Sequence, residues 1–252
     1  MEKNYCNIKG KGSVVIRTTI FTSFLIFNVI SMMAQDLKPG ENEIKKFDHG
    51  VITYQIEYLT DPNEKPLVSL LPIEMTYKFK GNDIVQYVEG WMGIFRMSWI
   101  VNYKDQTCYV LLKMFNENYY YESTFDNSIN IGYNNIQDLK IEDIAGEVRE
   151  IAGLKCMRAM VYSSDTLFKE PFEIYYSKEF DIKAPNINLS YKDFPNVLMN
   201  FKASFHKYPQ IFNAVKFEAV SVDDNEFVVP KEYKKVTKEK FMELFSILMD
   251  EK

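Results

Sequence analysis

The residues of this chain that could perform chemistry are few and widely separated. There are two histidines, His49 and His206, and three cysteines, Cys6, Cys108 and Cys156. A zinc site needs three or four converging ligands, and a nucleophilic thiol needs a base beside it. Neither histidine has a second plausible ligand near it in the sequence, and Cys156 has no assignable histidine partner. We therefore expect no metal and no cofactor.

Carboxylate pairs are the other candidate acid–base groups. Glu142 with Asp143 and Asp223 with Asp224 both fall in predicted turns. Glycoside hydrolysis needs two carboxyl groups that flank a cleft, and solvated turns are the simpler explanation of these pairs. A glycine-rich phosphate loop, a Gly-x-Ser-x-Gly elbow and a Cys-x-x-Cys pair are absent from the sequence. We predict that the protein is not an enzyme.

Aromatic residues carry the strongest remaining signal. Their alternation along the chain allows two interpretations: an ordinary packed core, or the lining of an apolar cavity in a curved sheet that does not fully close. In the second interpretation these residues are the candidate ligand-binding site. The set comprises Tyr77, Phe79, Tyr87, Trp91, Phe95, Met97 and Trp99.

Strands must position these side chains, because apolar and polar residues alternate with period two. The clearest strand covers residues 73–80, and Gly81–Asn82 then turns the chain into a hairpin. About ten such strands follow one another without the crossover helices of a parallel sheet. This pattern predicts an all-β domain with a C-terminal helix, in which a curved antiparallel sheet forms a half-barrel. Residues 136–144 fit either a short helix or an irregular edge.

The end of the chain changes period. Four apolar residues recur at helical spacing after Thr237, which can cap a helix, and charged residues occupy the opposite face. We expect this amphipathic helix to act as a lid or plug on the sheet. Its apolar face comprises Phe241, Leu244, Phe245 and Leu248.

The N-terminus has the order of a secretory signal peptide. Four basic residues up to Arg17 precede an apolar run over residues 20–33, and Ala34 follows it. The run is too short for an ordinary membrane span. We expect an exported mature chain, soluble in the periplasm or cell envelope and not membrane-spanning. The predicted organisation is a signal peptide (1–34), a polar tether (35–47), a half-barrel domain (48–236) and the C-terminal helix (237–252).

Charge and cysteine content limit the partners. The net charge of the whole chain is −5, and the leader carries four bases and one acid, so the mature chain has −5 − 3 = −8. This balance argues against nucleic acid and against an anionic membrane surface. Cys6 precedes the apolar run, so we expect no lipidation there. Cys108 and Cys156 could form a disulfide in an oxidising compartment, or both could be buried free thiols.

A three-residue glycosylation sequon, Asn188-Leu189-Ser190, lies in a predicted loop. Asp165-Thr166-Leu167 resembles the short O-glycosylation motif of secreted Bacteroidota proteins and also lies in a predicted loop. Such short motifs occur often by chance, so both remain open.

Several short motifs resemble an exported family of unknown function. The hairpin at Glu150–Cys156 (EIAGLKC) is similar to the TIAGYKC hairpin of domain-of-unknown-function family 4412, and Phe227–Val236 (FVVPKEYKKV) to that family's ending. Gly50–Tyr54 resembles its first strand. Phe194–Leu198 stands where related GLPGLI-type proteins carry a Gly-containing segment, but this chain lacks that glycine.

The resemblance implies a periplasmic or exported protein of Bacteroidota, with a half-barrel similar to lipoprotein carriers of the LolA type. The family defines no catalytic residues. We expect a binding protein that holds a lipid or another apolar ligand on the concave face. The alternative is an envelope structural or protein-interaction module, with a fully packed core and a protein partner in the envelope.

Overall fold

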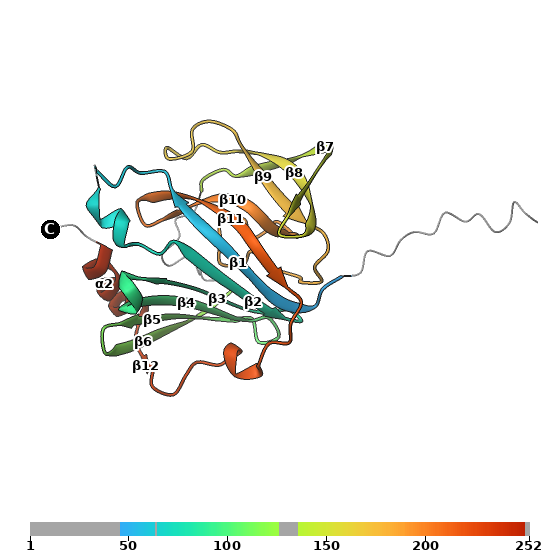
Figure 1. Cartoon of the computed structure of the whole chain (residues 1–252). Helices are drawn as coiled ribbons and strands as arrows, with labels where there is room; N and C mark the ends of the chain where they lie inside the picture. Colours follow the sequence, from blue (N-terminus) through green and yellow to red (C-terminus); the bar gives the residue numbers. More distant parts are fainter. Residues whose placement is uncertain (1–45, 64, 126–135, 250–252) are drawn as a thin grey trace, which may run out of the picture. The chain divides into compact units, whose positions relative to one another are not determined.

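The computed structural model describes residues 46–63, 65–125 and 136–249, all of them in one compact unit, Lys45–Lys252 (Figure 1). The predicted signal peptide, residues 35–45 of the predicted tether and the loop over residues 126–135 lie outside the described residues. None of the helices in the described ranges is long and apolar enough to cross a bilayer.

The described residues form one 12-stranded sheet and a C-terminal α-helix, α2 (Lys238–Met249). Short 3₁₀ turns lie at η1 (Pro66–Leu70), η2 (Trp91–Gly93) and η3 (Asp224–Phe227). The strands are β1 (His49–Tyr58), β2 (Glu74–Lys80), β3 (Asp83–Gly90), β4 (Phe95–Asn102), β5 (Thr107–Met114), β6 (Glu117–Thr124), β7 (Lys140–Ile151), β8 (Leu154–Tyr162), β9 (Phe172–Ser177), β10 (Val197–Phe205), β11 (Tyr208–Glu218) and β12 (Lys234–Lys235).

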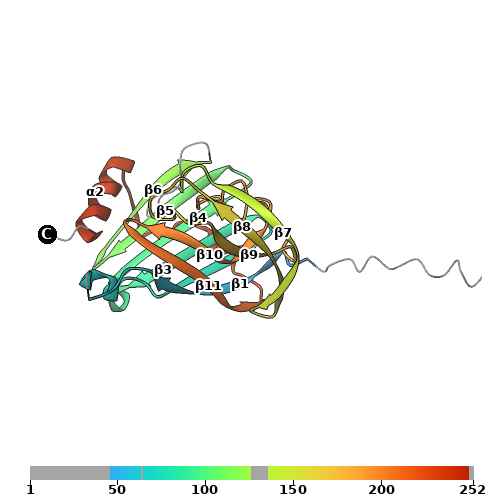
Figure 2. The ribbon, with the colours of Figure 1, turned by 90° about the horizontal axis from the view of Figure 1, so that it is seen from above.

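The sheet has the strand order β12-β6-β5-β4-β3-β2-β1-β11-β10-β9-β8-β7. Consecutive strands pair antiparallel in two runs, β1 to β6 and β7 to β11, and the pairing of β1 with β11 joins the runs. The sheet curls so that β2–β6 and β7–β10 form two facing walls (Figures 1 and 2). The prediction of a curved antiparallel half-barrel with one C-terminal helix is therefore confirmed. The short strand β12 is the exception, because it pairs parallel to β6.

Two strand boundaries differ from the sequence prediction. Residues 140–151 form the long edge strand β7. The register of its pairing with β8 shifts between Ile144 and Val148, where Gly146 has a left-handed backbone conformation. The alternation of Val215, Phe217 and Ala219 predicts a strand over residues 214–222, whereas strand β11 spans residues 208–218. Gln210 occupies an inward, buried position on β11. A polar residue at such a position breaks the apolar alternation, so the start of the strand was missed.

Packing begins slightly before the predicted domain boundary. Phe47, the last residue of the predicted tether, forms a bridge with Phe180. Its ring lies 4.8 Å from that of Phe217. This aromatic contact makes Phe47 part of the packed unit. Burial of its ring away from water is favourable, although the residues before it in the sequence are polar.

The inner face of the sheet carries the main core, and a long connection covers it. Residues 178–196, between β9 and β10, contribute Phe180, whose ring lies 5.5 Å from that of Phe79. The Asn188 amide donates to Gln86 Oε1 at 2.6 Å, and both side chains are buried. A buried amide pair of this kind is stabilising because each partner satisfies the other away from water. The sequon asparagine is therefore a core residue and does not lie in an exposed loop.

Helix α2 packs beside β6 at one end of the half-barrel (Figure 2). Thr237 caps it, since its Oγ1 accepts from the Lys240 N–H at 3.2 Å. Phe241 and Phe245 are buried, and their rings lie 6.2 Å and 5.6 Å from those of Tyr121 and Phe205. These contacts attach the apolar stripe of the helix to the inner core, as its periodicity predicted.

A second, smaller core lies on the outer face of β3–β6. It is covered by residues 219–236, called the outer segment below, which include η3 and β12 (Figure 1). Ion pairs fasten the outer segment at two points, with Lys78–Glu226 at 2.7 Å and Lys234–Glu117 at 2.8 Å. The cluster comprises Val85, Ile100, Leu111, Val222 and Phe227.

Candidate functional site: a groove on the outer face

The structure brings five of the seven predicted aromatic-site residues together on the inner face. Each has between 0 and 3% of its surface exposed, and all five belong to one core cluster. At such burial these side chains contact protein and not solvent, which is the packing expected of a core. They are Tyr77, Phe79, Phe95, Met97 and Trp99.

The other two members of the set are placed differently. Tyr87 pairs with Ser98 and Thr76 on the outer face, and the Arg96 guanidinium lies 3.9 Å from its ring centre. The grouping of Tyr87 with the inner set was wrong. On β3 the inward side chain is that of the polar Gln86, so the apolar pattern of this strand does not indicate which residues face the core. The side chain of Trp91 lies outside the described residues, as does that of Leu248 in the predicted lid.

Cys108 and Cys156 are both free and buried, so the disulfide considered from the sequence is not formed. Cys108 lies on β5 and Cys156 on β8, which are far apart in the strand order. Burial raises the pKa of the Cys108 thiol strongly and that of Cys156 to about 12. Thiols with such raised pKa values carry almost no thiolate at neutral pH and are poor nucleophiles.

The histidines lie far apart in the fold. His49 Nδ1 lies 2.7 Å from Asp48 Oδ1 at the surface, whereas the His206 ring packs 6.3 Å from that of Phe245. Across residues 46–63, 65–125 and 136–249, no group of three histidine, cysteine, aspartate or glutamate side chains could hold a metal ion.

The carboxylate pairs have structural partners. Asp143 on β7 accepts a hydrogen bond from the Tyr176 hydroxyl at 2.8 Å. Burial, together with this bond, raises the pKa of Tyr176 to about 12. Asp223 accepts from the Asn225 N–H at 2.9 Å as the cap of η3, and Asp224 pairs with Lys80 at 2.5 Å. These geometries stabilise a strand pair and a turn.

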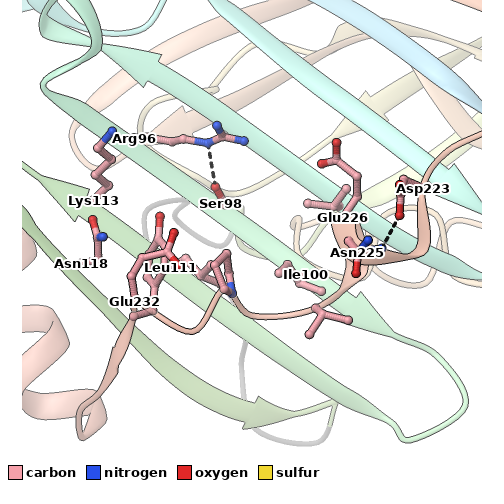
Figure 3. A pocket seen from close by; sticks show the side chains of 14 residues that line it. Arg96, Ser98, Ile100, Leu111, Lys113, Asn118, Asp223, Asn225, Glu226 and Glu232 are labelled. Atoms are coloured by element: carbon pink, nitrogen blue, oxygen red, sulfur yellow. Dashed lines mark hydrogen bonds between the residues drawn. The ribbon is translucent and has the colours of Figure 1, made fainter.

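A groove of about 470 Å³ opens on the outer face, between β3–β6 and the outer segment (Figure 3). Its floor is the sheet, and η3 with the residues up to Tyr233 forms its wall. Ile100 and Leu111 give the floor an apolar centre, and Arg96, Lys113 and Asn118 lie at one end. A concave surface that combines apolar and convergent polar groups is the usual form of a ligand site.

Strand register aligns the polar end of the groove. Glu89, Arg96, Lys113 and Asn118 are direct cross-strand partners on β3, β4, β5 and β6, so their side chains form one row. Directly opposite residues lie about 5 Å apart at Cβ and interact strongly. The row therefore places two cations side by side, with an acid at one end and an amide at the other.

Arg96 is held in place by three neighbours. Its Nη1 lies 3.1 Å from Glu89 Oε1, its Nε donates to Ser98 Oγ at 3.4 Å, and its guanidinium stacks on the Tyr87 ring.

Tyr233 lies in the wall of the groove near Arg96. Burial raises the pKa of the Tyr233 phenol. The charge of Arg96 lowers this pKa in part, and the charges of Glu232 and Glu89 raise it further. The phenol stays protonated at neutral pH and is available as a hydrogen-bond donor at this end of the groove.

At the opposite end of the groove, the charged side chains already have partners. Glu226 is neutralised by its pair with Lys78, and Asp223 is engaged in capping η3. Val228, from the wall, is 60% exposed. This end therefore offers an apolar contact and little free charge, which gives the groove a polarity along its length.

Sequence reasoning did not find this groove. Its residues come from two stretches, 85–118 and 223–233, which are brought together by the packing of the outer segment on the sheet. The available signal was the pattern over residues 93–103, where the polar Arg96 and Ser98 alternate with apolar residues. Nothing in that pattern predicts which outward residues become covered.

Comparison with known proteins gives a fold-level likeness. No protein-family model and no curated protein matches the chain. The resemblance to family 4412 therefore stays a prediction. A solved structure described as "Structure of PNGF-II in P21 space group" is similar at 12% identity with a TM-score of 0.50. The match covers 78% of this chain and 33% of that chain, so this chain spans about a third of its length and shares a β-sheet fold with that part.

Proposed function

We propose that this protein is an exported, non-catalytic binding module. In this proposal the half-barrel is a packed scaffold, and the binding surface is the groove on its outer face. The observation that carries the proposal is the burial of Trp99 and its inner-face neighbours, part of which residues 178–196 cover. A ligand on the inner face would have to displace that connection and its buried hydrogen bonds.

Specific contacts support a closed inner face. The Tyr77 hydroxyl donates to the Pro185 carbonyl at 3.1 Å, and the Tyr191 hydroxyl donates to the Lys202 carbonyl at 2.7 Å. Breaking such buried bonds leaves unpaired polar groups, each at a cost of about 1–3 kcal/mol. The packed interaction module is thus better supported than a carrier that holds a lipid in the hollow of the half-barrel.

Native mass spectrometry of the mature chain, Asp36–Lys252, purified from the envelope fraction tests the proposal. We expect the mass of the protein without lipid, and no fatty acid or phospholipid in a solvent extract. Adducts of lipid mass that disappear in Trp99→Ala, while the variant keeps its fold, would overturn the proposal in favour of the lipid carrier.

Export is part of the same proposal and is supported by the basic leader, the apolar run and Ala34. The envelope and cytoplasmic fractions of the producing cell can be compared by N-terminal sequencing of the protein. We expect a mature chain that begins near Gln35 or Asp36 in the envelope fraction. Uncleaved protein confined to the cytoplasm would contradict export.

A further inference from the structure

We propose that the outer groove binds the free carboxyl terminus of an extended peptide, with the carboxylate beside Arg96 and Lys113. This inference rests on the proposed function, because both place the ligand in the outer groove. It adds the chemical class of the ligand and the orientation in which it binds.

The first argument is an unbalanced pair of cations. Arg96 and Lys113 are direct cross-strand partners, and like charges in this position destabilise a sheet. Glu89 neutralises Arg96, but Lys113 forms no ion pair with any described residue. An anion between the two side chains would replace this repulsion with charge-assisted hydrogen bonds, which are about twice as strong as neutral ones.

The surrounding acids limit the charge of that anion. Glu89 lies beside Arg96 at this end of the groove, and Glu232 lines the groove next to Tyr233. Glu89 already pairs with Arg96, so the positive charge that is left for a ligand is the single charge of Lys113. One negative charge, as on a carboxylate, can be accommodated beside Lys113, whereas a doubly charged phosphate would be repelled by the two glutamates.

The second argument is an unsatisfied polar atom at the same end. Asn118 Oδ1 is buried and has no hydrogen-bond partner. Asn118 is the cross-strand partner of Lys113, so its side chain lies in the same row. A buried acceptor without a donor is costly, and a backbone N–H of a bound peptide would supply one.

The body of the groove favours a peptide over a fatty acid, which also ends in a carboxylate. Asn118 and Tyr233 offer polar atoms in the groove, and an acyl chain would leave these without a hydrogen-bond partner. The apolar area on Ile100, Leu111 and Val228 is small and suits one side chain of a peptide. We therefore expect an apolar last or penultimate residue in the ligand.

Two hexapeptide libraries of mixed sequence, N-acetylated and identical except at the C-terminus, test the proposal. One ends in a free carboxylate and the other in an amide. Each is captured on the purified mature protein and quantified by mass spectrometry. We expect at least about tenfold greater retention of the carboxylate library, which corresponds to about 1.4 kcal/mol. Equal retention of the two libraries, or retention of neither, would overturn the carboxylate assignment.

Lys113→Gln shows whether the groove is responsible. We expect this variant to lose about tenfold in retention of the carboxylate library, with thermal stability at least as high as before, because Lys113 is exposed and its charge opposes that of Arg96. Lys104→Gln is the matched control: it removes the same charge from an exposed lysine in the β4–β5 turn, outside the groove, and should retain full binding. Equal losses in the two variants would overturn the groove as the site.

Palmitate, offered as a competitor, separates the two sources of carboxylate. We expect palmitate not to displace the retained peptides. Displacement that depends on Lys113 would overturn the peptide assignment while the binding-module proposal stands. Lipid adducts that depend on Trp99 would instead overturn the proposed function itself, so the two failures are distinguishable.

Discussion

The inner and outer faces of the strands β3–β6 are built from the same backbone but stabilised differently. On the inner face, Trp99 and its neighbours form a continuous core that extends to β11 and α2. On the outer face, five buried residues form a small cluster between the sheet and a segment that is held by ion pairs at two points. The inner face is thus stabilised mainly by burial of apolar area. The outer face is stabilised by a small apolar cluster and by the ion pairs of the outer segment.

The difference shows on which face of the sheet a binding site can change its side chains without loss of the fold. Each side chain of the inner core contacts many others, so any change there affects a large contact network. The outer face keeps a row of polar residues open beside its small core. A groove placed there can change its side chains at low cost in stability, because surface substitutions usually change the free energy of unfolding by less than about 0.5 kcal/mol.

Trp99→Ala should produce the largest effect. The Trp99 side chain is fully buried, and replacing such a residue with alanine removes apolar area and leaves a cavity. We expect a loss of about 3–5 kcal/mol in the free energy of unfolding, measured by urea denaturation. A loss below about 1 kcal/mol would show that this wall of the inner face is not packed and would remove the contrast between the two faces.

Leu112→Ala and Leu111→Ala form a matched pair on β5, with inward and outward side chains that are 0% and 3% exposed. We expect Leu112→Ala to cost about 4 kcal/mol and Leu111→Ala about 2 kcal/mol. The outer segment can close over the smaller side chain, whereas the inner core cannot collapse. Denaturation midpoints of the two variants measure the difference. Equal losses would mean that the outer cover is as rigid as the core.

Asn188→Ala tests the polar attachment of residues 178–196. The substitution leaves Gln86 Oε1 buried without its donor, so we expect a loss of about 1–3 kcal/mol. Combining it with Gln86→Leu should recover part of the loss, because no unpaired group then remains. Thermal unfolding of the two single variants and the double variant checks this. If the double variant loses the sum of the two single losses, the two amides are not coupled.

Acid should loosen the outer segment with the smallest effect. The hydrogen bond and the charge from Lys234 lower the pKa of Glu117 from its usual 4.5. A lowered pKa in the folded state means stabilisation that is fully present above 4.5 and is lost as the pH falls through the folded value. Backbone NMR shifts of Lys234–Val236 should therefore move below pH 4.5. Glu117→Gln should abolish that transition, and an unchanged transition in this variant would contradict the assignment.

The sequence by itself determined the class of fold. Alternation in β1, β2 and β4 predicts strands with one buried face, because side chains of a strand point to opposite sides in turn. The i, i+3, i+4 spacing of Phe241, Leu244 and Phe245 predicts the C-terminal helix for the same local reason. Local periodicity is sufficient for these elements because each depends on neighbours a few residues away.

Tertiary structure alone decided which face is closed and where the groove lies. The connection over residues 178–196 has no periodicity, so its place over the inner face follows from Phe180, Asn188 and the contacts they make. The groove joins Arg96 to Tyr233, which are distant in sequence and meet because the outer segment returns to pair with β6. Such contacts depend on the sum of many burial terms across the whole chain, and no short pattern of residues encodes them.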